Sequence, residues 1–378
     1  MGALPHKPPP MPRKRLAWSV IPALALGAMA AALVPRGYDA GFLLLAQDDP
    51  VKLADHAVAE RLNPAVAEQE IEAALAADDV DLANSFVDLA AERGIAIRPE
   101  LLARLQDANS TSANAVRNVR SFAWGLVTGE PTDMVGLAGT AVGDLSVLGD
   151  IRDAAREGVH YANGEPTDEL VLGLASVGMA ITAGTYASRG VGTPARVGLT
   201  LVKAGRKAGW LSGHLASWVS RSVREVVDMG AMRSALAQAS ITQPAVAVRA
   251  ARDAVKLERV EGLVNAARDV GRVQAKAGTK AAFDSLKVAE QPRDLARFAR
   301  LAEVKGSKTR AIIKLAGRAA IALTGALFDL ASALFTALFT LFGFCSAVKS
   351  TTERTTSRYL RWRKARRWRK RMEALAEG

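Results

Sequence analysis

Two long uncharged stretches near the ends of the chain constrain its structure most. Residues 16–34 contain no charged side chain, and residues 319–348 contain only Asp329. A helix of nineteen residues is about 28 Å long, close to the thickness of about 30 Å of a bilayer's hydrocarbon core. The second stretch is apolar around the whole helix, which is typical of lipid surroundings or of a large core. We therefore expect an integral membrane protein with transmembrane segments at 16–34 and 319–348.

The charges beside these stretches predict the orientation. The basic, Pro-rich residues 1–15 precede the first stretch, and the basic residues 349–378 follow the second. Cations collect on the cytoplasmic side of a span. We expect a bacterial inner-membrane protein with both termini cytoplasmic and the central region periplasmic. A cleaved signal peptide is the alternative for the N-terminus, because residues 28–30 form an acceptable small-x-small site, although the apolar region is longer than usual.

The last thirty residues predict a basic amphipathic helix. Trp362, Ala365, Trp368 and Met372 fall along one stripe, and cations cover the rest of the helix. This pattern is typical of a segment that lies on an anionic membrane surface, so we expect anionic lipid headgroups as partners. Nucleic acid is the alternative partner, because Arg and Trp also suit phosphates and bases. The predicted lipid-binding residues are Arg361, Trp362, Arg363, Lys364, Arg366, Arg367, Trp368, Arg369, Lys370 and Arg371.

Two single residues in the second apolar stretch stand out. Asp329 is its only charge, and ionisable residues inside a membrane are costly and usually functional. We predict an intramembrane polar site at Asp329, which caps a kink, faces a partner helix or lies near an interface. Cys345 is the only cysteine, so no intrachain disulfide forms, and we expect it to act as a small hydrophobic residue.

Charge is distributed unevenly along the middle of the chain. Residues 35–188 carry a net charge of −14, whereas residues 189–310 carry +13. Such an asymmetry indicates different faces or compartments, or anionic partners for the second half. The uncharged residues 170–188 offer an alternative with an extra span, which would leave the acidic half outside and bring the basic half into the cytoplasm. The long translocated loop of the two-span arrangement is equally consistent with the charge rule.

Cap and stop signals predict an all-α fold with several helical regions. Residues 50–108 read as an acidic helical hairpin domain, with a helix that begins at Asn63-Pro64 and a second that ends at Gly94. Residues 189–310 read as basic amphipathic helices, one of which begins at Gln291-Pro292 and ends before Gly306. Within this basic region, the Gly-rich residues 205–213 are expected to form a flexible joint between helices.

Residues 115–188 form a Gly-rich helical repeat region. The pentapeptide Gly-Glu-Pro-Thr-Asp at 129–133 recurs at 164–168, thirty-five residues later. The string Gly-Asp-Ile-Arg-Asp at 149–153, followed by an apolar Gly-rich helix, resembles the pre-toxin segment of bacterial polymorphic toxins over residues 129–186. That resemblance implies a toxin domain after it, yet no nuclease, deaminase or protease motif follows. The whole chain also resembles uncharacterised membrane proteins of high-GC proteobacteria, which implies no function.

Motifs that would identify an enzyme are missing from the sequence. It contains no GxSxG, GxxxxGK[ST], HExxH or CxxC pattern. Glu157 and His160 have a di-iron spacing but lack the second Glu-x-x-His that such a site needs, so we expect no metal and no cofactor. We predict a membrane-anchored helical envelope protein that acts as a scaffold or binds a protein partner. A membrane-inserting or pore-forming effector is the first alternative, and an enzyme that uses the acidic cluster at 144–157 is the second.

Overall fold

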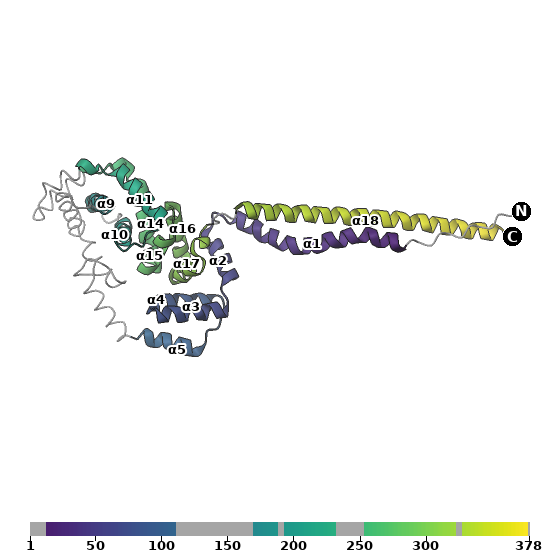
Figure 1. The fold of residues 1–378 in the computed structure, drawn as a ribbon, viewed down its shortest axis with the longest axis horizontal. Coiled ribbons are helices and arrows are strands. Elements are labelled where there is room, and N and C mark those ends of the chain that lie inside the picture. Colours follow the sequence, from purple (N-terminus) through teal and green to yellow (C-terminus); the bar gives the residue numbers. More distant parts are fainter. Residues whose placement is uncertain (1–12, 111–168, 188–192, 232–252, 323–326, 377–378) are drawn as a thin grey trace, which may run out of the picture. The chain divides into compact units, whose positions relative to one another are not determined.

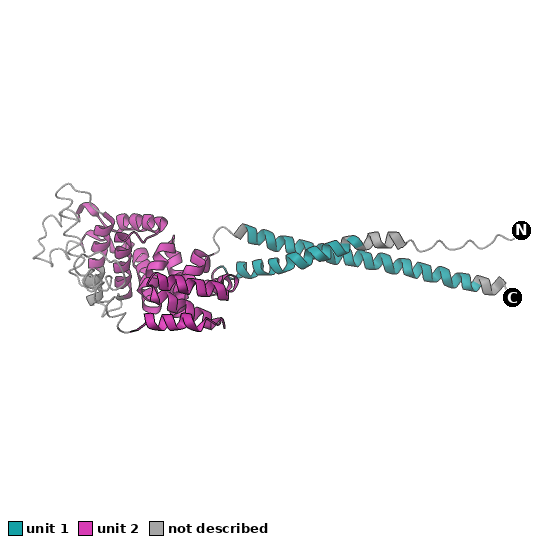
Figure 2. Cartoon of the chain, turned by 60° about the horizontal axis from the view of Figure 1, so that its bottom comes forward, with its two compact units in different colours: residues 1–47, 323–378 teal, residues 48–322 magenta. Residues whose placement is uncertain are grey.

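The computed structural model describes residues 13–110, 169–187, 193–231, 253–322 and 327–376. Helices make up the regular structure of these residues, which confirms the all-α prediction, and the one β feature among them is an isolated bridge between Val227 and Val255. The chain divides into two compact units (Figures 1 and 2). Unit 1 contains residues 1–47 and 323–378, and unit 2 contains residues 48–322.

Unit 1 is a pair of long antiparallel helices, α1 (Arg13–Leu45) and α18 (Leu327–Ala376). Along the pair, Gly27 lies beside Phe344 and Gly41 lies beside Leu334. A Cβ atom on Gly37 would lie 2.3 Å from the Cβ of Ala337, so only glycine permits this approach of the two backbones. The start of α1 and the C-terminal end of α18 therefore lie at the same end of unit 1.

The first helices of unit 2 begin and end where their caps predict. They are α2 (Pro50–Arg61), α3 (Pro64–Ala76), α4 (Val80–Glu92) and α5 (Pro99–Ala108). The Asn63 side chain accepts a hydrogen bond from the Val66 amide at 3.0 Å, which confirms the predicted start of α3. Gly94 adopts a φ of 66° just after α4, which confirms the predicted stop.

The later helices of unit 2 surround α14. They are α9 (Glu169–Ala187), α10 (Thr193–Lys207), α11 (Gly213–Val226), α14 (Glu261–Ala277), α15 (Thr279–Val288), α16 (Pro292–Lys305) and α17 (Thr309–Ala316). Helices α10, α15 and α16 all pack on α14. Two glycines bring α10 and α14 together: a Cβ on Gly198 would lie 1.6 Å from the Ala267 carbonyl oxygen, and a Cβ on Gly271 would lie 2.0 Å from that of Pro194.

The predicted helix after Gln291 is confirmed in detail. Gln291 and Asp294 form a capping box at the start of α16, and Gly306 follows its end with a φ of 54°. Its apolar stripe, which includes Phe298 and Leu301, is fully buried. The spacing of Leu257, Val260, Val264, Ala267 and Val270 predicts an apolar stripe for α14; this is wrong at its start, because Leu257 is 59% exposed and the buried face begins at Leu263.

The first part of α9 is a core helix of unit 2. Every residue from Leu170 to Ala180 is buried, and α9 packs on α10 and α11. A Cβ on Gly173 would lie 2.0 Å from Cγ1 of Val223 on α11, and the Ser176 hydroxyl donates to the Leu172 carbonyl. These residues are the first part of the stretch that offered an extra span, and protein side chains occupy the surroundings that lipid would take.

The flexible joint expected at residues 205–213 is a packed turn. Gly209 adopts a φ of 70°, which lets the chain reverse after α10. The Trp210 ring packs edge-on against Phe283 at 4.9 Å between centroids, and the Lys287 ammonium lies 5.0 Å from the Trp210 ring centre. Gly209 is needed here for its left-handed backbone conformation, so the glycine content of a segment did not predict a flexible joint.

Two glycines of α14 make a matched test of this packing. We expect Gly271→Ala to lower the free energy of unfolding by about 1–3 kcal/mol, because the added methyl group meets the backbone of α10. Gly262→Ala in the same helix has open space around it and should not destabilise. Thermal unfolding of the full chain in detergent, followed by circular dichroism, measures both; equal melting temperatures would contradict the close contact.

Candidate functional site

Arg310 joins the acidic and basic halves of the chain inside unit 2. Its terminal nitrogens donate to both carboxylate oxygens of Asp79 at 2.6 and 2.5 Å, and its Nε donates to Asp284 at 2.8 Å. Asp79 also caps α4, where its side chain accepts a hydrogen bond from the Leu82 amide. The Arg310 side chain is only 9% exposed. A two-pronged pair of this kind fixes orientation as well as contact.

A second set of ion pairs lies at the other end of α4. The Lys305 ammonium contacts both Asp55 and Glu92 at 2.7 Å, and its side chain is 9% exposed. Lys308 also binds Glu92, and the Ser307 hydroxyl donates to Asp88 at 2.6 Å. Acidic residues of α2 and α4 thus meet the basic end of α16 and the turn that follows it.

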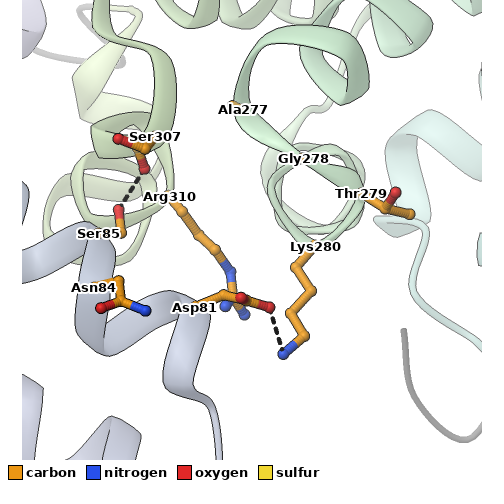
Figure 3. A pocket seen from close by; sticks show the side chains of 9 residues that line it. All are labelled: Asp81, Asn84, Ser85, Ala277, Gly278, Thr279, Lys280, Ser307 and Arg310. Atoms are coloured by element: carbon orange, nitrogen blue, oxygen red, sulfur yellow. Dashed lines mark hydrogen bonds and ion pairs between the residues drawn. The ribbon is translucent and has the colours of Figure 1, made fainter. Parts of the chain in front are cut away.

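A cavity of about 260 Å³ lies beside the Arg310 pair (Figure 3). In this view Lys280 points toward Asp81, and the two atoms of their ion pair lie 3.0 Å apart. The Ser85 hydroxyl donates to the Ser307 carbonyl at 2.7 Å and accepts from the Ala311 amide at 2.8 Å. The lining residues are Asp81, Asn84, Ser85, Ala277, Gly278, Thr279, Lys280, Ser307 and Arg310.

The chemistry of this cavity is that of a structural junction. Lys280 and Arg310 pair with three carboxylates, Asp79, Asp81 and Asp284, and Lys287 beside Asp284 supplies the third positive charge, so the charges of the cluster balance. The Ser85 hydroxyl already makes two hydrogen bonds, which leaves it poorly placed as a nucleophile. The lining residues include neither His nor Cys, and the described part of the chain holds no group of His, Cys, Asp and Glu suited to a metal ion.

The ion pairs of both sets favour the charged forms of Asp79, Glu92 and Lys305. Burial opposes ionisation of Asp79, but the hydrogen bonds and charges of Arg310 and Lys280 outweigh it and lower the pKa of Asp79 from 3.8 to about 2. Hydrogen bonds from Lys305 and Lys308 lower the pKa of Glu92 from 4.5 to about 2. Burial would lower the pKa of Lys305, yet Asp55 and Glu92 raise it.

The residues predicted to bind lipid all lie on α18. This helix continues from the apolar stretch into the basic tail, so the tail is no separate helix. Of the ten predicted residues nine are exposed and Arg369 is half-buried. Trp362 and Trp368 are 38% and 64% exposed, and the Arg366 guanidinium lies 5.3 Å from the centre of the Trp362 ring. The cations surround the helix and the structure does not gather them on one face.

Asp329 lies near the start of α18 and is exposed. Because Leu334 packs beside Gly41 of the antiparallel α1, Asp329 is level with the last residues of α1. The structure therefore places it at one end of the helical pair. The other predicted features, which are the repeat at 129–168, the acidic cluster at 144–157 and its neighbour His160, lie outside the described residues.

Sequence reasoning missed the ion pairs of the junction. From the sequence, Asp78-Asp79 indicates only a turn and a helix cap, and Lys280, Lys305 and Arg310 lie in the region 189–310 predicted as basic helices. The change of charge sign along the chain was the signal that could have found them, since it was compatible with the two halves binding each other. Comparison with known protein families, curated proteins and solved structures gives no match.

The lowered pKa values predict how stability depends on pH. A carboxylate whose pKa is lower in the folded than in the unfolded state stabilises above the unfolded pKa and loses this effect as pH falls to the folded pKa. We therefore expect the melting temperature to fall between about pH 4.5 and pH 2 as Asp79 and Glu92 become protonated.

The double variant Asp79→Asn/Glu92→Gln should be less stable at pH 7 and should have a flatter profile in that window. Asp107→Asn serves as the control, because this exposed carboxylate belongs to no ion pair of the junction. Thermal unfolding at a series of pH values measures the profiles. Parallel profiles for wild type and the double variant would contradict the assignment.

Proposed function

We propose that α1 and α18 cross the bacterial inner membrane as a two-helix hairpin and hold unit 2 in the periplasm as a scaffold that binds another protein. Residues 329–371 of α18 include an apolar window long enough to span a bilayer, and only 11% of that window is buried. Large exposed apolar side chains also cluster on both helices. Those between Arg36 and Lys349 are Ile21, Leu24, Met29 and Val34 on α1 and Leu338, Phe339, Leu341, Phe342 and Val348 on α18, and others lie beyond Arg36, at Phe42, Leu45 and Phe335.

The register of the hairpin supports a shared membrane band. Because Gly27 lies beside Phe344 and Gly37 beside Ala337, the exposed apolar residues of the two helices are at the same level. Arg36 marks one edge of this band and Lys349 marks the other. The band is about 20 Å long at 1.5 Å per residue, shorter than a hydrocarbon core of about 30 Å. Long basic side chains that extend to the headgroups, with slight bilayer thinning, accommodate such a difference.

This position of the bilayer changes the role of Asp329. Arg36 and Asp39 lie between the band and the last residues of α1, which are level with Asp329. Asp329 therefore belongs outside the hydrocarbon core, on the side of unit 2. Tyr38, whose side chain is 75% exposed, falls at the boundary, where Tyr is commonly found. Lys349 and Arg354 fall at the opposite boundary, where they meet anionic headgroups.

The ion pairs of unit 2 favour two spans over three. Asp79 and Glu92 precede the alternative span at 170–188, and Arg310 and Lys305 follow it. A crossing at 170–188 would separate these partners by a membrane. Two spans leave both halves in one compartment and both basic ends, 1–15 and 349–378, in the cytoplasm, as the charge rule expects.

A scaffold also suits the chemistry of unit 2 better than the alternatives. Its cavity has internally balanced charges, which gives no support for an enzyme. A pore-forming effector would have to withdraw residues 170–180 from the core, where they are buried by α10 and α11. The protein partner is the proposed ligand of the outer surface of unit 2.

Single cysteines in a Cys345→Ser background test this topology. In intact spheroplasts, a membrane-impermeant maleimide should label Ala65→Cys on α3, Ala296→Cys on α16 and Asp329→Cys, since all three positions are exposed on the periplasmic side. Phe342→Cys, in the middle of the apolar band, should react only after detergent is added. Ser357→Cys should react only after the cytoplasm is opened.

Each labelling pattern decides between arrangements. Reaction at Ala65→Cys but not at Ala296→Cys in spheroplasts would refute two spans in favour of an extra crossing between them. Protection of both would place unit 2 in the cytoplasm and refute the proposal. Reaction of Phe342→Cys without detergent would refute the membrane band.

A further inference from the structure

The C-terminal part of α18 extends beyond α1. Gly27 lies beside Phe344, and α1 begins fourteen residues before Gly27, at Arg13. In an antiparallel pair this start is level with about residue 358 of α18. Residues 359–376 thus continue as a helix with no described helix beside them, and the side chains described in this segment are nearly all exposed. This extension, residues 359–376, needs a partner to explain its composition.

The extension cannot lie flat on the membrane that α18 crosses without a bend. Sharp bends in helices occur at Pro, at Gly or at local breaks in the hydrogen-bond ladder. The sequence has neither Gly nor Pro between Gly343 and Ala376, and α18 is one continuous helix over this range. The extension therefore follows the axis of the span away from the bilayer.

The distal cations are then too far from the headgroups for strong attraction. Arg366 follows Lys349, at the edge of the membrane band, by seventeen residues, which is about 25 Å of helix. The Debye length at physiological salt is about 8 Å, so the lipid charge is largely screened at that distance. Lipid accounts for Lys349 and Arg354 but leaves the cations at 361–371 without a counter-charge.

Residues 361–371 have the composition of a surface for a polyanion. Eight of these eleven residues are cationic, six of them Arg, and no acid lies between Glu353 and Glu373. Arginine pairs with phosphate through two parallel hydrogen bonds, and Trp362 and Trp368 expose rings on which bases stack. Cations on every side of the helix suit a duplex groove, where phosphates line both walls, better than a flat acidic protein surface.

We propose that residues 361–371 bind nucleic acid on the cytoplasmic side, held about 20–35 Å from the bilayer by the unbroken helix. The proposal rests on the proposed crossing of the membrane by α18. Attraction to phosphates supplies most of the affinity, so binding should depend weakly on base sequence and strongly on salt.

The test uses the full chain in nanodiscs of zwitterionic phosphatidylcholine and a fluorescein-labelled duplex of about 20 base pairs, with anisotropy as the readout. We expect the wild type to bind with an affinity that falls steeply with salt. Arg366→Gln/Arg367→Gln/Arg369→Gln/Lys370→Gln should weaken binding at least about tenfold and reduce the salt slope by about 3–4.

The matched control removes four exposed cations from unit 2, as Arg259→Gln/Lys276→Gln/Arg293→Gln/Lys314→Gln. This control should bind the duplex as the wild type does. Equal losses in both variants, or no binding by the wild type, would overturn the proposal.

A second measurement decides between nucleic acid and lipid. In nanodiscs that contain brominated phosphatidylglycerol, quenching of tryptophan fluorescence that disappears in Trp362→Phe/Trp368→Phe would place the extension on the headgroups and overturn the proposal; equal quenching in both proteins supports it. Carbonate extraction of cell membranes tests the anchoring separately. Release of the protein would refute membrane crossing, and with it the 20–35 Å spacing, whereas duplex binding depends on the tail alone.

Discussion

Arg310 contacts Asp79 across 231 positions of sequence, and the arrangement of unit 2 depends on this pair. A buried Arg–carboxylate pair gives little net stability, because the cost of removing both charges from water offsets their attraction. Loss of either partner, however, removes the two-pronged contact and leaves a largely buried charge with a single counter-charge, Asp284 for Arg310 or Lys280 for Asp79. The pair therefore selects one way of packing α4 against α15 and α17 and excludes shifted alternatives. Lys305, between Asp55 and Glu92, applies the same constraint at the end of α16.

The same interaction links the fold to the proposed topology. A charge difference along a chain is ambiguous, because it is compatible with two compartments, with an external anionic partner or with internal pairing. In unit 2 Asp55 of α2 and the acidic helix α4 with its cap Asp79 take the place of an external partner for α16 and α17. Five cations of the basic half thus find counter-charges in the acidic half: Lys280, Arg297, Lys305, Lys308 and Arg310. The cations of the α18 extension differ, since among the side chains that the structure describes none of residues 361–371 forms an ion pair with an acid.

Local signals in the sequence were sufficient for many helix boundaries. Asn63, Gly94 and Gly306 act through their own side chains or backbone angles, which distant residues do not alter. Signals of composition were less reliable. The Gly-rich residues 205–213 form a packed turn in which the Trp210 ring contacts Phe283. The apolar residues 170–180 are buried in a protein core, where α9 packs on α10 and α11. Each outcome depends on a partner far along the chain.

The sequence by itself determined the helical character, the apolar stretches and the caps, because these follow from side chains within a few residues of one another. Only the tertiary structure decided which charges pair, which glycines let backbones touch and how α1 aligns with α18. That alignment moves Asp329 from the presumed interior of a span to the end of the helical pair. The physical reason is the same throughout: packing and ion pairing act between surfaces brought together by the fold, and sequence distance carries little information about which surfaces meet.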